Sequence, residues 1–234
     1  MGIIQIPANP GNYGNKRSLT EIKYIVMHYT GNNGDTAKNN GNYFKNNVVK
    51  TSAHYFVDSN TVVQSVPDDR IAWHCGAKTY YHPECRNANS IGVELCDDQK
   101  DAVIYPSRAT IDRALELVRE LMKKYNVPAA RVIRHYDVSH KLCPAYWCGT
   151  DEKDELWMTA FWNKLATPAE PVVPVAPDRY NTIAEIEIYA PWARPTVDKL
   201  IRMGCIMGDG TGLDLSRDML RLLVINDRAG CYDE

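Results

Sequence analysis

The sequence lacks a long apolar run, a strong net charge and a signal-peptide pattern. No segment reaches the roughly 18 to 20 apolar residues that a membrane-spanning helix needs, so we expect no membrane insertion. The formal net charge is −2 over 234 residues, which gives nucleic-acid binding no support. The first residues have no cationic start followed by an apolar stretch of signal length. We therefore expect synthesis in the cytoplasm without a secretion signal.

The seven cysteines also lack the spacing of a small disulfide framework, and their number is odd. We expect most of them to be reduced and buried, and the spacing leaves open whether Cys75 and Cys85 pair. Apolar residues make up 44% of the chain and charged residues 24%, which is ordinary for a globular protein. The length suits one larger domain with a small additional module.

A proline-rich segment at 166–177 marks the boundary between these two parts. Its prolines recur every third residue, which matches the three residues per turn of a polyproline II helix. Such a segment is a semi-rigid spacer that could hold two modules roughly 35 Å apart. The alternative is a proline-rich loop that packs on the domain surface. We predict a domain at 1–165, a linker at 166–177 and a second module at 178–234.

Short apolar segments rich in β-branched and aromatic residues predict strands in the first domain. These segments lie at 22–30, 53–58, 61–66, 91–96 and 131–135. Ser59 and Asn60 separate the second segment from the third, which predicts a hairpin.

Helices are predicted between these strands. The strongest is 108–125, where apolar residues recur at the spacing of a core-facing helix. Ser107 or Thr110 is its expected N-cap, and Asn126 follows its last turn. Further helices are expected at 35–46 and 152–165. The alternation predicts an α/β fold with a mixed central β-sheet flanked by helices.

The second module is predicted to be small and mostly helical. One helix covers 193–204, a glycine-rich turn follows at 208–212, and a last helix starts after Ser216. Two helices of this size bury little surface, so such a unit usually needs a partner.

Three segments carry side chains with chemical potential. His28 lies near the end of a predicted strand, Glu94 lies inside another, and His135, Lys141 and Cys143 lie within one short segment. Imidazole and thiolate are good zinc ligands, and catalytic zinc usually has three protein ligands with one open position. Each residue alone also fits a bland role, because a strand histidine is often a hydrogen-bonded core residue and a cysteine is often a buried thiol.

The first domain resembles the type 2 N-acetylmuramoyl-L-alanine amidases, which share a fold with T7-type phage lysozymes and peptidoglycan recognition proteins. The resemblance covers about residues 20–165. It rests on YIVMHYTG at 24–31, SAHYFVD at 52–58, AWHCG at 72–76, IGVELC at 91–96 and RHYDVSHKLCP at 134–144. The last motif is the most specific, because it places histidine, lysine and cysteine at the family's spacing.

The resemblance implies a role for each matching residue. His28, His135 and Cys143 match the Zn²⁺ ligands of the family. Lys141 matches a lysine that stabilises the oxyanion, and Glu94 matches a glutamate that positions or deprotonates water. A buried salt bridge, with Lys141 as one possible partner, is the alternative role of Glu94.

Other matching positions imply weaker assignments. His54 and His74 are expected to line the substrate groove or to be structural, and Trp73 and Tyr29 are candidates for the same groove or for the core. Some family members carry a tyrosine just before the histidine of the HY motif. Here that position is Ala53, so no tyrosine role is expected there.

The segment APWARPTVDKLIRMGCIMGDG at 190–210 has a fainter resemblance to half of a surface-layer homology repeat, a family that binds cell-wall polymers. Only one copy is present, so both wall binding and homodimerisation remain open for this module.

The resemblance implies a bacteriolytic hydrolase, with bacterial peptidoglycan as partner, that cuts the bond between N-acetylmuramic acid and L-alanine. A phage or prophage endolysin made in the bacterial cytoplasm and acting at the cell wall after release fits best. The alternatives are a host autolysin or recycling amidase, a non-catalytic peptidoglycan-binding protein, and another zinc hydrolase such as a deacetylase. The presence of Cys143 favours an enzyme over the binding protein, since binding relatives have lost this cysteine.

Overall fold

A computed structural model describes residues 2–100, 103–166 and 177–233. The chain divides into two compact units, Met1–Ala169 and Glu170–Glu234, and each is described by itself. Most of the predicted linker at 166–177 lies outside the described residues.

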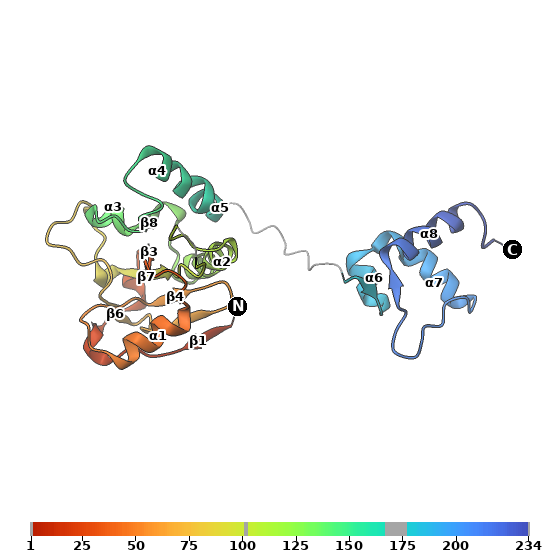
Figure 1. Ribbon diagram of the computed structural model, residues 1–234, viewed down its shortest axis with the longest axis horizontal. Coiled ribbons are helices and arrows are strands. Elements are labelled where there is room, and N and C mark those ends of the chain that lie inside the picture. Colours follow the sequence, from red (N-terminus) through yellow and green to blue (C-terminus); the bar gives the residue numbers. More distant parts are fainter. Residues whose placement is uncertain (1, 101–102, 167–176, 234) are drawn as a thin grey trace. The chain divides into compact units, whose positions relative to one another are not determined.

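The first unit is built on a six-stranded mixed sheet with the strand order β1-β5-β4-β7-β3-β8 (Figure 1). The strands are β1 Ile3–Gln5, β3 Tyr24–Tyr29, β4 Tyr55–Val57, β5 Val62–Gln64, β7 Ser90–Leu95 and β8 Val132–Arg134. Neighbours run parallel except β4 and β5, which form the predicted antiparallel hairpin. The predicted fold class is therefore confirmed, although β1 was not expected.

One face of this sheet packs against the long helix α2, Arg108–Tyr125. Successive side chains of a strand point to opposite faces, so Ile25 and Met27 of β3 pack with the apolar stripe of α2. Ser107 is the N-cap, with its side chain accepting from the Thr110 amide, and Asn126 ends the helix in the left-handed conformation. Both boundaries match the sequence prediction.

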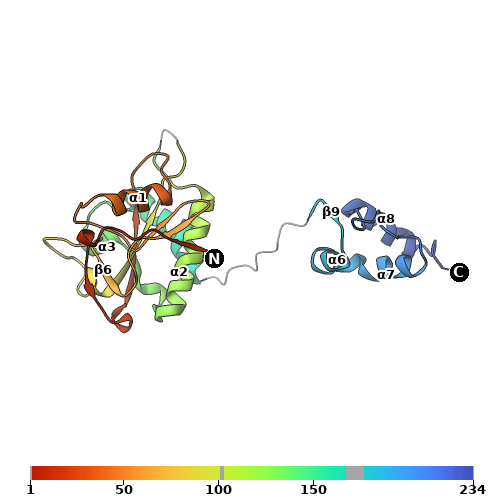
Figure 2. The same ribbon diagram turned by 90° about the horizontal axis from the view of Figure 1, so that it is seen from below.

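The opposite face is covered in part by α1, Ala37–Asn46. Phe56 and Val63 point to this side and pack with Ala37 and Phe44 of the helix. Helices α1 and α2 therefore lie on opposite sides of the sheet, as the turned view also shows (Figure 2). His28 of β3 and Glu94 of β7 line a surface hollow on the side of the sheet opposite α2.

Three helical segments follow β8. They are α3 His135–Ser139, α4 Asp151–Trp157 and α5 Asn163–Ala166, the last two joined by a π-helical turn at Met158–Trp162. The helix predicted at 152–165 is thus interrupted by a π turn that apolar periodicity does not show. The strand predicted at 131–135 ends at Arg134, and His135 already begins α3.

A small second sheet pairs β2 Tyr13–Lys16 with β6 Arg70–Ala72. Short 3-10 turns lie at Pro10–Asn12, Leu19–Glu21, Asn87–Asn89 and Ala129–Arg131. The buried Arg17 follows β2, and its guanidinium donates to the carbonyls of Asp68, Asn87, Ala88 and Ser90. This one side chain ties the N-terminal segment to the loop that precedes β7.

The second unit is mostly helical, as predicted. It contains α6 Ile183–Tyr189, α7 Arg194–Arg202 and α8 Arg217–Arg228, with a short turn at Pro191–Ala193 and a two-residue pairing of β9 Arg179–Tyr180 with β10 Leu215–Ser216. Ser216 caps α8. Tyr180, Ile186, Val197 and Leu220 are fully buried in its own apolar core, so the unit has a core independent of the first.

Two expectations about the whole chain are testable here. Within the described residues, no helix is both long enough and apolar enough to cross a bilayer. The seven cysteines are free thiols, five of them buried and only Cys205 and Cys231 exposed. The expectation that most of the cysteines are buried is therefore confirmed.

We expect Arg17→Ala to lower the free energy of unfolding of the first unit by about 3 kcal/mol, because buried carbonyls would lose their donors. Arg108→Ala is the matched control, since its ion pair with Asp112 is exposed and is worth less than about 1 kcal/mol. Denaturant unfolding followed by tryptophan fluorescence measures both. Equal effects of the two substitutions would contradict the assigned role of Arg17.

Candidate functional site

The three predicted metal ligands converge from separate elements. His28 is the penultimate residue of β3, His135 is the first residue of α3, and Cys143 lies in the loop after α3. Since β3 and β8 are neighbouring parallel strands, their carboxyl ends meet at one edge of the sheet. The Tyr136 amide donates to the Cys143 carbonyl over 3.0 Å, which folds the loop back onto α3.

The candidate ligand atoms of His28, His135 and Cys143 all lie within 4.8 Å of one another. His28 Nδ1 lies 3.7 Å from Cys143 Sγ, and the rings of the two histidines meet edge to face with centroids 4.8 Å apart. All three residues are buried, with 2%, 4% and 4% of their surfaces exposed. Among the residues that the structure describes, this is the one cluster of histidine, cysteine or acidic side chains that could hold a metal ion.

The electrostatics of these three side chains suit a cation. Burial and the neighbouring His135 lower the pKa of His28, and burial with Lys141 lowers the pKa of His135 to about 4. Both rings are therefore neutral, which is the form that ligates metals. Burial raises the pKa of the Cys143 thiol, so a thiolate there needs a nearby positive charge. His135 Nδ1 is buried without a hydrogen-bond partner, an unsatisfied acceptor that a metal would complete.

Glu94 lies beside this centre because of strand register. In the parallel pairing of β3 with β7, His28 aligns with Glu94, and both point to the face opposite α2. Glu94 Oε2 is shielded from solvent and has no hydrogen-bond partner. Burial raises the pKa of Glu94 to about 8, with Lys141 acting in the opposite direction. A carboxyl group of this kind can accept and return a proton near neutral pH.

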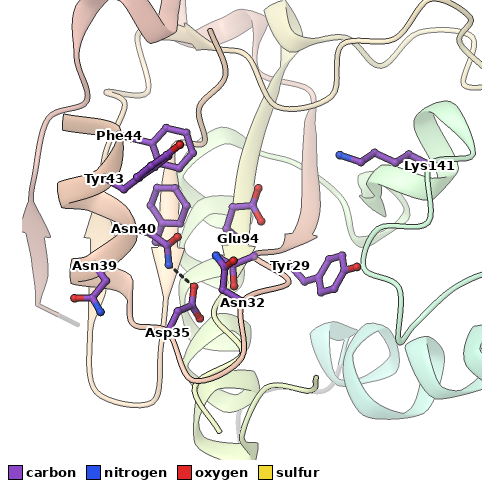
Figure 3. A pocket seen from close by; sticks show the side chains of 11 residues that line it. Tyr29, Asn32, Asp35, Asn39, Asn40, Tyr43, Phe44, Glu94 and Lys141 are labelled. Atoms are coloured by element: carbon purple, nitrogen blue, oxygen red, sulfur yellow. Dashed lines mark hydrogen bonds between the residues drawn. The ribbon is translucent and has the colours of Figure 1, made fainter. Parts of the chain in front are cut away.

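An open groove gives access to the centre. A hollow of about 380 Å³ is lined by His28, Cys143, His74, Glu94 and Lys141, among others, and it adjoins a second hollow of about 630 Å³ that shares Tyr29, Glu94 and Lys141. Figure 3 shows the Glu94 carboxylate and the Lys141 ammonium entering from opposite sides. Lys141 is exposed, so its charge is available to a bound molecule.

The other residues selected from the sequence fall into different surroundings. Tyr29 lines both hollows, and His74 lines the smaller one. Trp73 is half-buried and faces another surface hollow beside Tyr13 and Arg70. His54 is fully buried: its Nδ1 accepts from the Gly92 amide, and its Nε2 lies 3.1 Å from the Arg70 carbonyl. The structure therefore puts His54 in the core and away from the groove.

Part of the groove wall was not identified from the sequence. Helix α1 contributes Asn39, Asn40, Tyr43 and Phe44, and Asp35 lies just before it (Figure 3). Asn40 Nδ2 donates to Asp35 Oδ2 over 2.5 Å. The helix itself was expected at 35–46, but no motif links its polar face to a site. The one available signal was the presence of aromatic and amide side chains on a helix with little apolar surface.

Comparisons with known proteins agree with this geometry. A family model described as N-acetylmuramoyl-L-alanine amidase matches residues 18–146. The amidase CwlL of Bacillus licheniformis is 36% identical over 157 residues, which are 63% of this chain and 41% of that protein. The amidase CwlA of Bacillus subtilis strain 168 is 38% identical over 124 residues, 53% of this chain and 43% of its own. The chain thus spans about two fifths of the length of these curated relatives.

Solved structures give the same picture. The structure of PlyL superposes with a TM-score of 0.56 at 32% identity, covering 70% of this chain and 97% of PlyL. The catalytic domain of XlyA superposes with a TM-score of 0.57 at 27% identity, covering 70% and 99%. The mixed sheet and its buried His-His-Cys centre thus define an α/β amidase fold with a metal-type site. The chain belongs to the N-acetylmuramoyl-L-alanine amidase family.

We expect Glu94→Gln to leave the fold intact and to raise the free energy of unfolding by about 1 kcal/mol. At neutral pH, folding forces Glu94 either to bury a charge or to take up a proton, because burial raises its pKa to about 8, and a neutral amide avoids this cost. Thermal and denaturant unfolding measure the change, and Glu116→Gln on the exposed side of α2 is the control. A loss of stability specific to Glu94→Gln would instead indicate that this carboxylate holds the fold through an ion pair.

Proposed function

We propose that this protein is a zinc-dependent peptidoglycan hydrolase that cuts the amide bond between N-acetylmuramic acid and L-alanine. The observation that carries the proposal is the buried cluster of His28, His135 and Cys143 beside an open groove that also presents Glu94 and Lys141. Two neutral imidazoles and one thiolate suit Zn²⁺ and leave room for a further ligand.

The chain's own residues divide the work of amide hydrolysis. Zinc, when bound, supplies Lewis acidity and a nucleophile at neutral pH. Lys141 projects into the groove and stabilises the negative oxygen that develops on the substrate carbonyl. Glu94, with its pKa raised to about 8, takes a proton from the attacking water and delivers it to the departing amine. Tyr29 and the polar face of α1 line the groove along which a peptide or glycan can extend.

Lysis of bacterial cell walls as a phage or prophage endolysin is the role that we favour for this activity. The similarity to the solved structure of a mutant endolysin from Bacillus subtilis supports this role. The second unit favours action on an assembled wall, because the recycling of soluble fragments needs no such unit. In this role the protein is made in the bacterial cytoplasm and reaches the wall after release. The retained Cys143 argues against a binding protein without activity.

The second unit is proposed to hold the enzyme at its substrate. It has its own apolar core, and its large apolar side chains Ile188, Leu222 and Ile225 are more than half exposed. Exposed groups of this size favour contact with another surface. A wall polymer is the occupant that fits the proposed role best, because attachment raises the local concentration of the enzyme on the wall. Homodimerisation is the alternative.

The activity can be tested by comparing two single-cysteine variants. We expect the protein to clear a peptidoglycan suspension, releasing new L-alanine amino termini without new reducing sugars, and to lose this activity with a chelator until Zn²⁺ is added. Cys143→Ser should lack stoichiometric zinc and lytic activity, because it removes a ligand. Cys148→Ser is the control, since this nearby buried thiol donates to the Pro144 carbonyl and is not part of the ligand cluster. Full activity of Cys143→Ser would refute the ligand assignment.

The role of the second unit can be tested by truncation. The first unit has a core of its own, so a chain ending at 165 should fold and keep its turnover on soluble fragments. We expect its sedimentation with intact walls to fall at least tenfold, while residues 178–234 alone should sediment. Unchanged wall binding by the shortened chain would exclude targeting by the second unit. If light scattering shows a dimer for the full chain and a monomer for the shortened chain, the second unit serves homodimerisation instead.

A further inference from the structure

A chain of hydrogen bonds leads from the candidate metal ligand His28 into the protein. His28 Nε2 lies 3.0 Å from His74 Nδ1, and His74 Nε2 lies 3.1 Å from Ser90 Oγ. Ser90 Oγ in turn lies 2.6 Å from the Arg86 carbonyl oxygen. His74 was selected from the sequence as a groove residue, but both of its ring nitrogens are engaged by protein groups.

The direction of this chain follows from its inner end. A carbonyl oxygen only accepts, so the single hydroxyl proton of Ser90 goes to Arg86. Ser90 Oγ must then accept from His74, which fixes the proton of that ring on Nε2. His74 Nδ1 is consequently an acceptor, and His28 Nε2 donates to it.

The consequence reaches the metal side of His28. With its proton on Nε2, the ring has its lone pair on Nδ1, the nitrogen that lies 3.7 Å from Cys143 Sγ. The reverse direction would put a proton on Nδ1, facing the other ligands. It would also leave the Ser90 and Arg86 oxygens 2.6 Å apart with no proton between them.

Neighbouring residues confine both the ring and the backbone of His74. Its ring lies against β7 so closely that a Cβ added to Gly92 would come within 2.6 Å of His74 Cγ. The side chain of Asn87 accepts from the amides of His74 and Cys75. Only 8% of the residue is exposed. The close contact with Gly92 and the hydrogen bonds with His28 and Ser90 therefore restrain the orientation of the ring.

We propose that His74 and Ser90 are positioning residues that fix the tautomer and ring orientation of His28 for zinc. Outer partners of this kind orient metal-bound histidines and typically change metal affinity by about 10- to 100-fold. The inference rests on the zinc site of the proposed function but does not depend on which bond the enzyme cuts.

The first test compares two buried serines. Zinc affinity is measured by competition with a chromogenic chelator on the full chain. We expect Ser90→Ala to weaken zinc binding at least tenfold, since His74 loses the acceptor that fixes its tautomer. Ser65→Ala is the matched control, because Ser65 is equally buried and its hydroxyl has no hydrogen-bond partner. Equal zinc affinity for both variants and the wild type would overturn the proposal.

The second test separates positioning from a general structural role. His74→Asn keeps an amide oxygen near the position of Nδ1, whereas His74→Ala removes the acceptor, so we expect zinc affinity in the order wild type, Asn, Ala. The increase in melting temperature on adding zinc should follow the same order. If the metal-free proteins lose stability but zinc affinity is unchanged, His74 is structural only and the proposal fails. A wild type that binds zinc tightly without cutting peptidoglycan would refute the proposed function and leave this inference intact.

Discussion

The parallel pairing of β3 with β7 is the constraint on which the site depends. Its register sets His28 opposite Glu94, and the alternation of side chains sends both to the face that α2 does not cover. A slip of β3 by one residue would turn its apolar side chains, such as Ile25 and Met27, away from the core. The hydrophobic pattern that folds the sheet therefore also fixes the relative positions of the candidate metal ligand His28 and the carboxyl group of Glu94.

The parts of the site and of the fold that were predictable from the sequence have signals that are local along the chain. His28, His135 and Cys143 were predicted as zinc ligands because their segments resemble motifs of the amidase family, and the folded chain brings the three side chains together. The helix at Arg108–Tyr125 was predictable because its apolar stripe is long and its caps are typical. In each case the signal is local in sequence, so it can be read without knowing the fold.

The features that escaped prediction depend on contacts between distant residues. Strands β1, β2 and β6 were missed because they are mostly exposed or half-buried and lie outside the apolar segments, whereas the equally short β4, β5 and β8 lie within such segments. His54 and His74 look alike as motif histidines, yet one is enclosed by Arg17, Arg70 and Gly92 while the other contacts His28. Only the folded chain distinguishes them.

The site buries titratable side chains that proteins usually leave exposed to solvent. Burying these groups without a metal costs free energy of folding. They are two imidazoles with lowered pKa values, a thiol with a raised pKa and a carboxyl group with an unpartnered oxygen. This cost is offset by the apolar core under α2 and by the hydrogen bonds that Arg17 donates to backbone carbonyls. A divalent cation bound between the three side chains would remove most of this cost, because it would accept the lone pairs of the neutral imidazoles and favour the thiolate form of Cys143. A metal ion bound at this cluster would therefore also stabilise the first unit.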